Sequence, residues 1–268
     1  MWVNNTKNGE FIMTELEKVY GLIRDRSEHG LSWLADNIVY LVESGSHAYG
    51  TDTEESDKDY KGIVIPPMEY HIGLHTFKSV QIETGAKDEK NTRDDIDITL
   101  YSLKEFTRLA LNSNPNIIEM LYVEEDSIIV DYKPLRCHRD MFLTDKLRKS
   151  YGGFGVSMMR RMEKAIAKGE YDGKTLMNLL RILESGRDAM LTGTLQTKRP
   201  NAEALLSIRH LGLDMKYDSH VEFITKLMDS KYGEFKQAEE GSVLPSKPNH
   251  SEVEELLMEL TKQHLDLE

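Results

Sequence analysis

Two apolar runs separated by a glycine-serine step constrain the possible folds of this chain more than any other feature. Residues 37–44 (NIVYLVES) are β-branched and apolar and stop at Gly45, which predicts a buried strand that ends in a tight turn. Residues 57–65 (DKDYKGIVI) predict a second strand, which ends at Pro66 because proline cannot continue a central ladder. The polar spacer 50–56 predicts a loop or one helical turn. The first part of the chain is therefore expected to be built on a sheet.

Carboxylates gather along the predicted strands. Asp57 and Asp59 share one face, because strand side chains alternate with a period of two, and they lie about 7 Å apart at a rise of about 3.3 Å per residue. Residues 95–101 (DIDITLY) alternate again and predict a third strand that carries Asp95 and Asp97 on one side. Hard oxygen ligands of this kind favour Mg²⁺ or Mn²⁺ over zinc. A third carboxylate would complete a two-metal site, and we choose Asp97, although alternation alone does not separate it from Asp95.

The Gly45-Ser46 step adds a phosphate-binding element to this arrangement. Backbone N–H groups and a hydroxyl at a strand end point at one spot, and a glycine lets a phosphate approach closely. The same letters also arise by chance, in which case residues 57–59 are only a solvated edge in the charged run 51–61. The apolar strand before the turn and the further acids on a third strand favour a nucleoside triphosphate site.

Composition restricts the classes of protein that remain. The chain has 46 acidic and 34 basic residues and a net charge of -12, which argues against coating nucleic acid by charge alone. Cys137 is the single cysteine, so an internal disulfide is excluded and a reducing compartment is indicated. No apolar run approaches the roughly 20 residues of a membrane helix. We therefore expect a cytoplasmic protein with no membrane partner.

The second half of the chain predicts a helical domain. We place a domain boundary near residue 133, so that residues 1–133 form an α+β domain on a small mixed sheet and residues 134–268 an all-helical domain. The first domain should also hold helices over 11–29 and 102–111 and from Asn114-Pro115 onward, an edge strand over 127–130 and a mobile loop over 85–93. The expected helices of the second domain lie near 139–150, 154–168, 173–191, 201–211, 219–238 and 251–265. Glycines in 152–155 predict a hinge, and 239–250 is a linker rich in Gly, Ser and Pro.

These residues resemble a known family. The runs GSHAYGT (residues 45–51) and SDKDYKG (residues 56–62) resemble predicted nucleotidyltransferases of the DNA polymerase β superfamily, in particular a bacterial and phage group. The resemblance continues through Asp97, the helix YSLKEFTRLAL, the run SNPNIIEML and the segments GKTLMNLLRILESGRDAMLTG and ALLSIR, and it spans roughly residues 35–215.

The resemblance implies an activity and a set of roles. An enzyme of the EC 2.7.7 type would use two Mg²⁺ or Mn²⁺ ions to move a nucleoside monophosphate from an NTP, with ATP as the expected donor, to an acceptor hydroxyl. Gly45 and Ser46 would hold phosphates, Asp57 and Asp59 would bind both metals, and Asp97 would be the third carboxylate. In the helical half, Lys174 and Arg181 match cations expected near the triphosphate, whereas Asn178 stands where a histidine is expected.

The acceptor stays open at this stage. An RNA end, a protein or a small molecule is compatible with the resemblance, because a fold does not choose among substrates. Arg160, Arg161, Lys164 and Lys168 would suit an RNA backbone, although a charge run is usually a solvated helix face. A metal-dependent phosphohydrolase and a non-catalytic nucleotide-binding regulator are the alternatives to the transferase.

Overall fold

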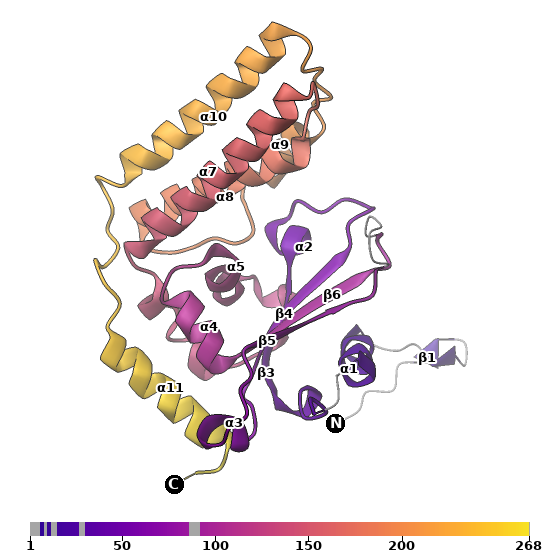
Figure 1. Ribbon diagram of the computed structural model, residues 1–268, viewed down its shortest axis with the longest axis vertical. Helices are drawn as coiled ribbons and strands as arrows, with labels where there is room; N and C mark the ends of the chain where they lie inside the picture. Colours follow the sequence, from indigo (N-terminus) through magenta and orange to yellow (C-terminus); the bar gives the residue numbers. More distant parts are fainter. Residues whose placement is uncertain (1–5, 8–9, 12–14, 27–29, 86–91, 268) are drawn as a thin grey trace.

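A mixed five-stranded sheet forms the centre of the first half of the molecule (Figure 1). The computed structural model describes residues 6–7, 10–11, 15–26, 30–85 and 92–267. The strand order is β5-β6-β4-β3-β7, with β4 and β6 parallel and the other neighbours antiparallel. The strands are β3 (Ile38–Ser44), β4 (Lys58–Val64), β5 (Ser79–Glu83), β6 (Ile96–Ser102) and β7 (Ile128–Val130). The predicted strands at 37–44, 57–65 and 95–101 are confirmed, and β7 is the predicted edge strand.

Short helices cover the sheet and connect its strands. The Ser102 hydroxyl accepts a hydrogen bond from the Glu105 N–H at 3.1 Å and caps the helix that follows β6. The Asn114 side chain caps the next helix, which begins at Pro115, so both predicted helix starts are confirmed. The α-helices of this half are α1 (Glu15–Arg26), α2 (Gly45–Tyr49), α3 (Glu69–Ile72), α4 (Leu103–Ala110), α5 (Pro115–Ile118) and α6 (Lys133–Arg136).

Some expectations for this half differ from the structure or fall outside it. The predicted helix 11–29 is shorter, because Phe11 belongs to a small two-stranded sheet of β1 (Thr6–Lys7) and β2 (Glu10–Phe11). Most of the predicted mobile loop 85–93, namely residues 86–91, lies outside the described residues.

Five longer helices form most of the second half, and one of them corrects the sequence prediction. They are α7 (Lys146–Ala167), α8 (Gly173–Thr192), α9 (Ala202–Arg209), α10 (Asp218–Ala238) and α11 (His250–His264). The separate helices predicted at 139–150 and 154–168, and the hinge at 152–155, are wrong, because α7 runs through all these glycines. A Cβ atom at Gly155 would lie 2.7 Å from Leu183, and one at Gly152 would lie 3.2 Å from Phe235. These glycines therefore permit close helix packing.

The apolar core continues across the position of the predicted domain boundary. One cluster of buried side chains includes Val42 from β3, Phe106 from α4, Leu183 from α8 and Leu260 from α11. The last helix returns to the first half and packs on α4 and α6 (Figure 1). Within the residues that the structure describes, no helix has the length and apolar character needed to cross a membrane.

Candidate active site

A tight turn between β3 and α2 forms one wall of the candidate site. Gly45 has a φ of +66°, and a Cβ atom at this position would lie 2.0 Å from the Asp59 Oδ2 atom. Only glycine allows this backbone conformation together with so close a carboxylate. The Thr51 N–H donates to the Ser46 carbonyl at 2.9 Å and closes the far end of the turn. The Gly-Ser step is therefore fixed directly against Asp59.

Two carboxylates lie side by side on the central strands. The parallel register of β4 and β6 pairs Asp59 with Asp97, and neighbouring strands lie about 4.8 Å apart. Asp57 immediately precedes β4. Burial raises the pKa of Asp59, and the negative charges of Asp57 and Asp97 raise it further, while Lys61 and Lys174 oppose the shift. The site thus concentrates negative charge that a cation would offset.

Asp95, the alternative to Asp97, lies in a different environment. Its carboxylate accepts hydrogen bonds from the Thr92 N–H at 2.7 Å and the Thr92 hydroxyl at 2.9 Å, and these bonds lower its pKa. Asp95 precedes β6, whereas Asp97 lies within the strand beside Asp59. This placement favours Asp97 as the third carboxylate of the candidate site.

A cavity of about 410 Å³ lies between the helical half and the carboxylates Asp57 and Asp59, and Asp97, on the neighbouring strand β6, is not among the residues that line it. Its sheet-side wall includes Gly45, Ser46, Asp57 and Asp59, which were all predicted as site residues. Its helical wall includes Lys174, Asn178 and Arg209. Cations therefore line the cavity opposite the carboxylates.

Lys174 and Arg209 are held together by the packing of two helix ends. The Asp172 side chain caps α8 by accepting from the Thr175 N–H at 2.9 Å. Gly173 touches the end of α9, since a Cβ atom there would lie 2.1 Å from the Arg209 carbonyl oxygen. Sequence reasoning missed Arg209, and its only signal was a basic residue in the last turn of a short helix within the run ALLSIR.

Asn178, which occupies the position where the resemblance suggests histidine, lines the same cavity. Its amide donates to the Lys174 carbonyl at 3.0 Å, so the side chain is anchored to the first turn of α8. An amide can donate and accept hydrogen bonds but does not titrate near neutral pH. This residue can orient a ligand without acting as a proton acceptor.

Arg181 lies behind the cavity and does not line it. Its Nη1 atom lies 3.1 Å and 3.2 Å from the two carboxylate oxygens of Glu119, and both side chains are 4% exposed. The guanidinium also lies 3.6 Å from the centre of the Tyr49 ring. Because Tyr49 lines the cavity, Arg181 contacts the site through this ring. The buried pair of Glu119 and Arg181 therefore supports α2 from behind.

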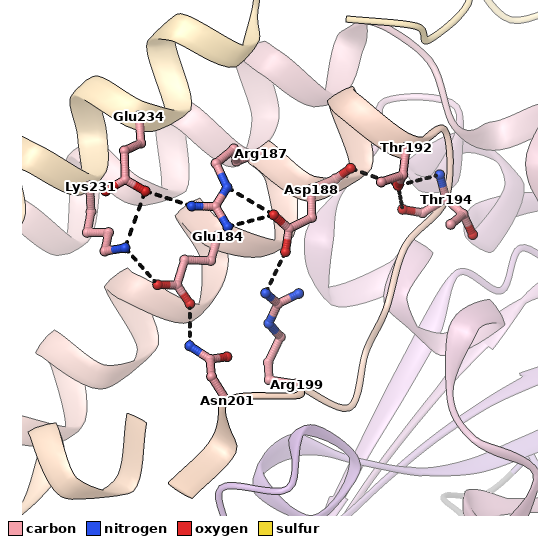
Figure 2. A network of polar contacts seen from close by, with 9 residues as sticks. All are labelled: Glu184, Arg187, Asp188, Thr192, Thr194, Arg199, Asn201, Lys231 and Glu234. Atoms are coloured by element: carbon pink, nitrogen blue, oxygen red, sulfur yellow. Dashed lines mark hydrogen bonds and ion pairs between the residues drawn. The ribbon is translucent and has the colours of Figure 1, made fainter. Parts of the chain in front are cut away.

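The connection between α8 and α9 ties the helical half to the same turn. The Arg199 N–H donates to the Tyr49 carbonyl at 3.1 Å, and the Thr197 hydroxyl donates to the Glu119 carbonyl at 3.0 Å. Figure 2 shows how this connection is held: Arg199 pairs with Asp188 at 2.7 Å, and Asn201 bonds to Glu184 at 2.9 Å. Further ion pairs in this network join α8 to α10 through Arg187, Lys231 and Glu234.

The donor set fits a divalent cation that is bound together with a phosphate ligand. Among the described residues, no three His, Cys, Asp or Glu side chains form a preassembled metal centre. Mg²⁺ is commonly bound through one or two carboxylates together with substrate phosphates, not by a cage made only of protein ligands. Asp57, Asp59 and Asp97 would supply the hard oxygen atoms for such an ion, and its charge would oppose both the burial and the repulsion that raise the pKa of Asp59.

A mixed sheet that carries adjacent carboxylates beside a glycine turn, faced by cations from a helical half, defines the class of polymerase β-like nucleotidyltransferases. Residues 17–259 match the family described as "RlaP: RNA repair pathway DNA polymerase beta family". The chain belongs to this family.

Two curated relatives share part of the sequence. An uncharacterized 38.9 kDa protein of Enterobacteria phage T4 is 36% identical over 115 residues, which are 41% of this chain and 34% of the relative. The uncharacterized protein YcgL of Bacillus subtilis (strain 168) is 34% identical over 84 residues, 31% of this chain and 30% of the relative. The matched segments thus span about a third of the relatives' own length.

Two solved structures are distantly similar. A spectinomycin adenyltransferase from Enterococcus faecialis, solved with ATP and spectinomycin, has a TM-score of 0.42 at 14% identity, covering 82% of this chain and 98% of the other. A nucleotidyltransferase-like protein from Exiguobacterium sibiricum has a TM-score of 0.29 at 11% identity, covering 92% of this chain and 78% of the other.

Proposed function

We propose that this protein transfers a nucleoside monophosphate from an NTP, with ATP as the expected donor, to the 3′ hydroxyl of an RNA. The observation that carries the proposal is the cavity of about 410 Å³ in which carboxylates face Lys174 and Arg209 across a glycine-serine turn. A triphosphate needs cations and backbone donors along its length, and metal-binding carboxylates near the phosphorus that reacts. The choice of RNA as acceptor draws on the family's description as an RNA repair pathway family.

The chain's own residues would divide the work as follows. The turn at Gly45 and Ser46 donates hydrogen bonds to the phosphates, and Lys174 and Arg209 neutralise their charge from the helical side. Asp57, Asp59 and Asp97 would hold divalent metal ions, which lower the pKa of an attacking hydroxyl and stabilise the leaving oxygen when bound. Asn178 orients the donor from α8.

In the proposed transfer, Asp97 accepts the proton that the attacking hydroxyl loses. The RNA 3′ oxygen forms a bond to the α-phosphorus, and the bond from that phosphorus to the bridging oxygen of the β-phosphate breaks. The hydroxyl proton passes to the Asp97 carboxylate, and pyrophosphate leaves with the electron pair of the broken bond. In-line attack requires the acceptor on the side of the α-phosphate away from the leaving group, so its hydroxyl would lie between the α-phosphorus and Asp97.

The test supplies each α-labelled NTP with Mg²⁺ and a synthetic RNA that ends in a 3′ hydroxyl, beside the same RNA with a 3′ phosphate. We expect the label to join only the hydroxyl-ended RNA, with release of pyrophosphate. The variant Asp57→Asn, Asp59→Asn should abolish labelling, while a control with two exposed acids changed, Asp126→Asn and Asp229→Asn, should keep it.

Three results would contradict the proposal. Equal labelling by the wild type and the Asp57, Asp59 variant would show that the site is elsewhere. Conversion of NTP to NMP and pyrophosphate without an acceptor would indicate a phosphohydrolase. Tight NTP binding without turnover on any acceptor would indicate a regulatory protein.

A further inference from the structure

Helix α7 carries a row of cations along its outer side. Its 22 residues contain six Lys or Arg and one Glu, whereas the whole chain has a net charge of -12. Residues three and four apart lie on one side of a helix. We call the residues at this spacing the outer face of α7. Five of them are cations and two are small residues: Lys146, Lys149, Gly153, Ser157, Arg160, Lys164 and, directly after the helix, Lys168. The row is about 33 Å long at 1.5 Å per residue.

The cations of this face differ from the ion-paired basic side chains of the protein. Several guanidinium groups elsewhere are held in ion pairs, as in Arg136 with Asp131 and Arg199 with Asp188. Within the described part of the chain, Lys146, Lys149 and Arg160 have no ion-pair partner, and neither do Lys164 and Lys168. Unpaired cations concentrated on one side of an acidic protein form a local positive field, which attracts polyanions.

Two hollows flank the same face. One of about 740 Å³ lies between α7 and the end of α4, where Lys146 and Lys149 meet Asn112 and no carboxylate is present among its lining residues. The other, of about 610 Å³, lies between α7 and α10 and is lined by Lys149 and Arg160. Its carboxylates, Asp145 and Glu239, are each paired with a cation of the same hollow, Arg148 and Lys236. Both hollows therefore keep an excess of positive charge.

The middle of the face carries small residues that leave room for a ligand. Gly153 and Ser157 line both hollows, and a Cβ atom at Gly153 would meet nothing within 4 Å. Phe154 lines the larger hollow and is only partly buried, so an aromatic ring lies beside the cations. Cations along a groove, with an aromatic side chain for stacking, are the elements that bind single-stranded nucleic acid without sequence preference.

We propose that the outer face of α7 binds the phosphate backbone of the single-stranded RNA whose 3′ end is the acceptor. This inference rests on the proposed function for its acceptor and extends it to a surface outside the catalytic cavity. Lys168 ends the face, and six residues later Lys174 lines that cavity, so their Cα atoms are at most about 21 Å apart. The strand would run along α7 and turn at the connection to α8 toward the carboxylates.

The experiment measures binding and not transfer. A 24-nucleotide single-stranded RNA with a 5′ fluorophore is titrated with the full chain, without NTP, and its fluorescence anisotropy is followed between about 50 and 300 mM salt. The test variant changes Lys149, Arg160 and Lys164 to Gln. The matched control changes three exposed lysines away from α7, namely Lys104, Lys133 and Lys262, to Gln and has the same net charge.

The size of the effect follows from counterion release. Each phosphate contact contributes about 0.7 to the salt slope on a single strand, so loss of three contacts lowers the slope by about 2. At 0.1 M salt the same loss weakens binding by about 100-fold. The control variant should bind as the wild type does. A second pair tests the face without removing a cation: Gly153→Glu should weaken binding by at least tenfold, and Gly153→Ala should not.

The outcomes separate this inference from the proposed function. Equal loss of affinity in the test and control variants would overturn the inference, as would binding of poly-glutamate as tight as that of RNA. The variant Asp57→Asn, Asp59→Asn should bind RNA normally, because its carboxylates are not part of the face. If the wild type transfers no nucleotide but binds RNA through α7, the proposed transfer fails and the surface stands. If the wild type labels RNA while the α7 variant binds RNA normally, the proposed transfer stands and the proposed binding surface fails.

Discussion

The buried pair of Glu119 and Arg181 allows a quantitative prediction about stability. Replacement of Arg181 by Met keeps much of the side-chain volume but removes the ion-pair partner of the Glu119 carboxylate in a site where both side chains are 4% exposed, and leaves Lys61 as the cation that interacts electrostatically with Glu119. Removal of one partner of a buried pair typically costs about 3–5 kcal/mol of the free energy of unfolding, because an uncompensated charge remains in a medium of low polarity. The contact of the guanidinium with the Tyr49 ring is lost as well.

The double variant Glu119→Gln, Arg181→Met should recover at least about 2 kcal/mol of this loss, since it removes both charges. Urea unfolding followed by circular dichroism measures the change. With a slope of about 3 kcal/mol per molar urea, a loss of 4 kcal/mol moves the midpoint by about 1.3 M.

An exposed pair in the same protein serves as the control. Lys226 and Glu222 lie 2.6 Å apart on α10 with 75% and 65% of their side chains exposed. Lys226→Met should cost less than about 1 kcal/mol, because solvent screens an exposed pair. If Arg181→Met and Lys226→Met destabilise the protein equally, or if the double variant is no better than Arg181→Met, the reasoning is refuted.

Three further predictions concern single positions. Gly45→Ala should destabilise the protein by at least about 1–2 kcal/mol and abolish transfer, because alanine disfavours a positive φ and its methyl group would meet the Asp59 carboxylate. Thermal unfolding measures the first effect and the transfer assay the second. Within α7, Gly153→Ala should stabilise by about 0.5–1 kcal/mol and Gly155→Ala should destabilise, since only the second position is tightly packed; equal effects in urea unfolding would contradict this. Burial lowers the pKa of His264 in the folded protein, so the imidazole binds a proton more readily in the unfolded chain. The stability that neutral His264 contributes is therefore present above pH 6.5 and is lost as the pH falls through the folded-state pKa. The urea midpoint should therefore fall more between pH 7.5 and 5.5 in the wild type than in His264→Gln.

Local sequence patterns were sufficient for the strands and for one wall of the site. Alternation and a terminal glycine located β3, β4 and β6, and the spacing of Asp57 and Asp59 placed both beside Gly45 because the turn and strand are close in sequence. The segment of β5 gave no clear signal along the sequence, since it is a mostly exposed strand next to β6 and lacks a clean apolar face.

Features that depend on distant residues were not predictable in this way. The glycines of α7 look like helix breakers along the chain, and only the neighbouring helices show that Gly152 and Gly155 permit close contact. Arg181 was expected at the nucleotide, but its partner Glu119 is 62 residues away, and a lone arginine gives no sign of whether it is buried. Arg209 enters the cavity because α9 ends against the start of α8, which no local pattern encodes.

The return of α11 to the first half has a consequence for how the protein is made. The Tyr132 hydroxyl donates to the Leu260 carbonyl, 128 residues away, and His264 bonds to Asn37, 227 residues away. At a synthesis rate of about 5–20 residues per second, Leu260 is made roughly 6–26 s after Tyr132. During that interval the apolar surfaces of α4 and α6 that α11 covers are exposed on the nascent chain. Residues 103–136 therefore form the segment that a ribosome-associated chaperone would have most reason to cover.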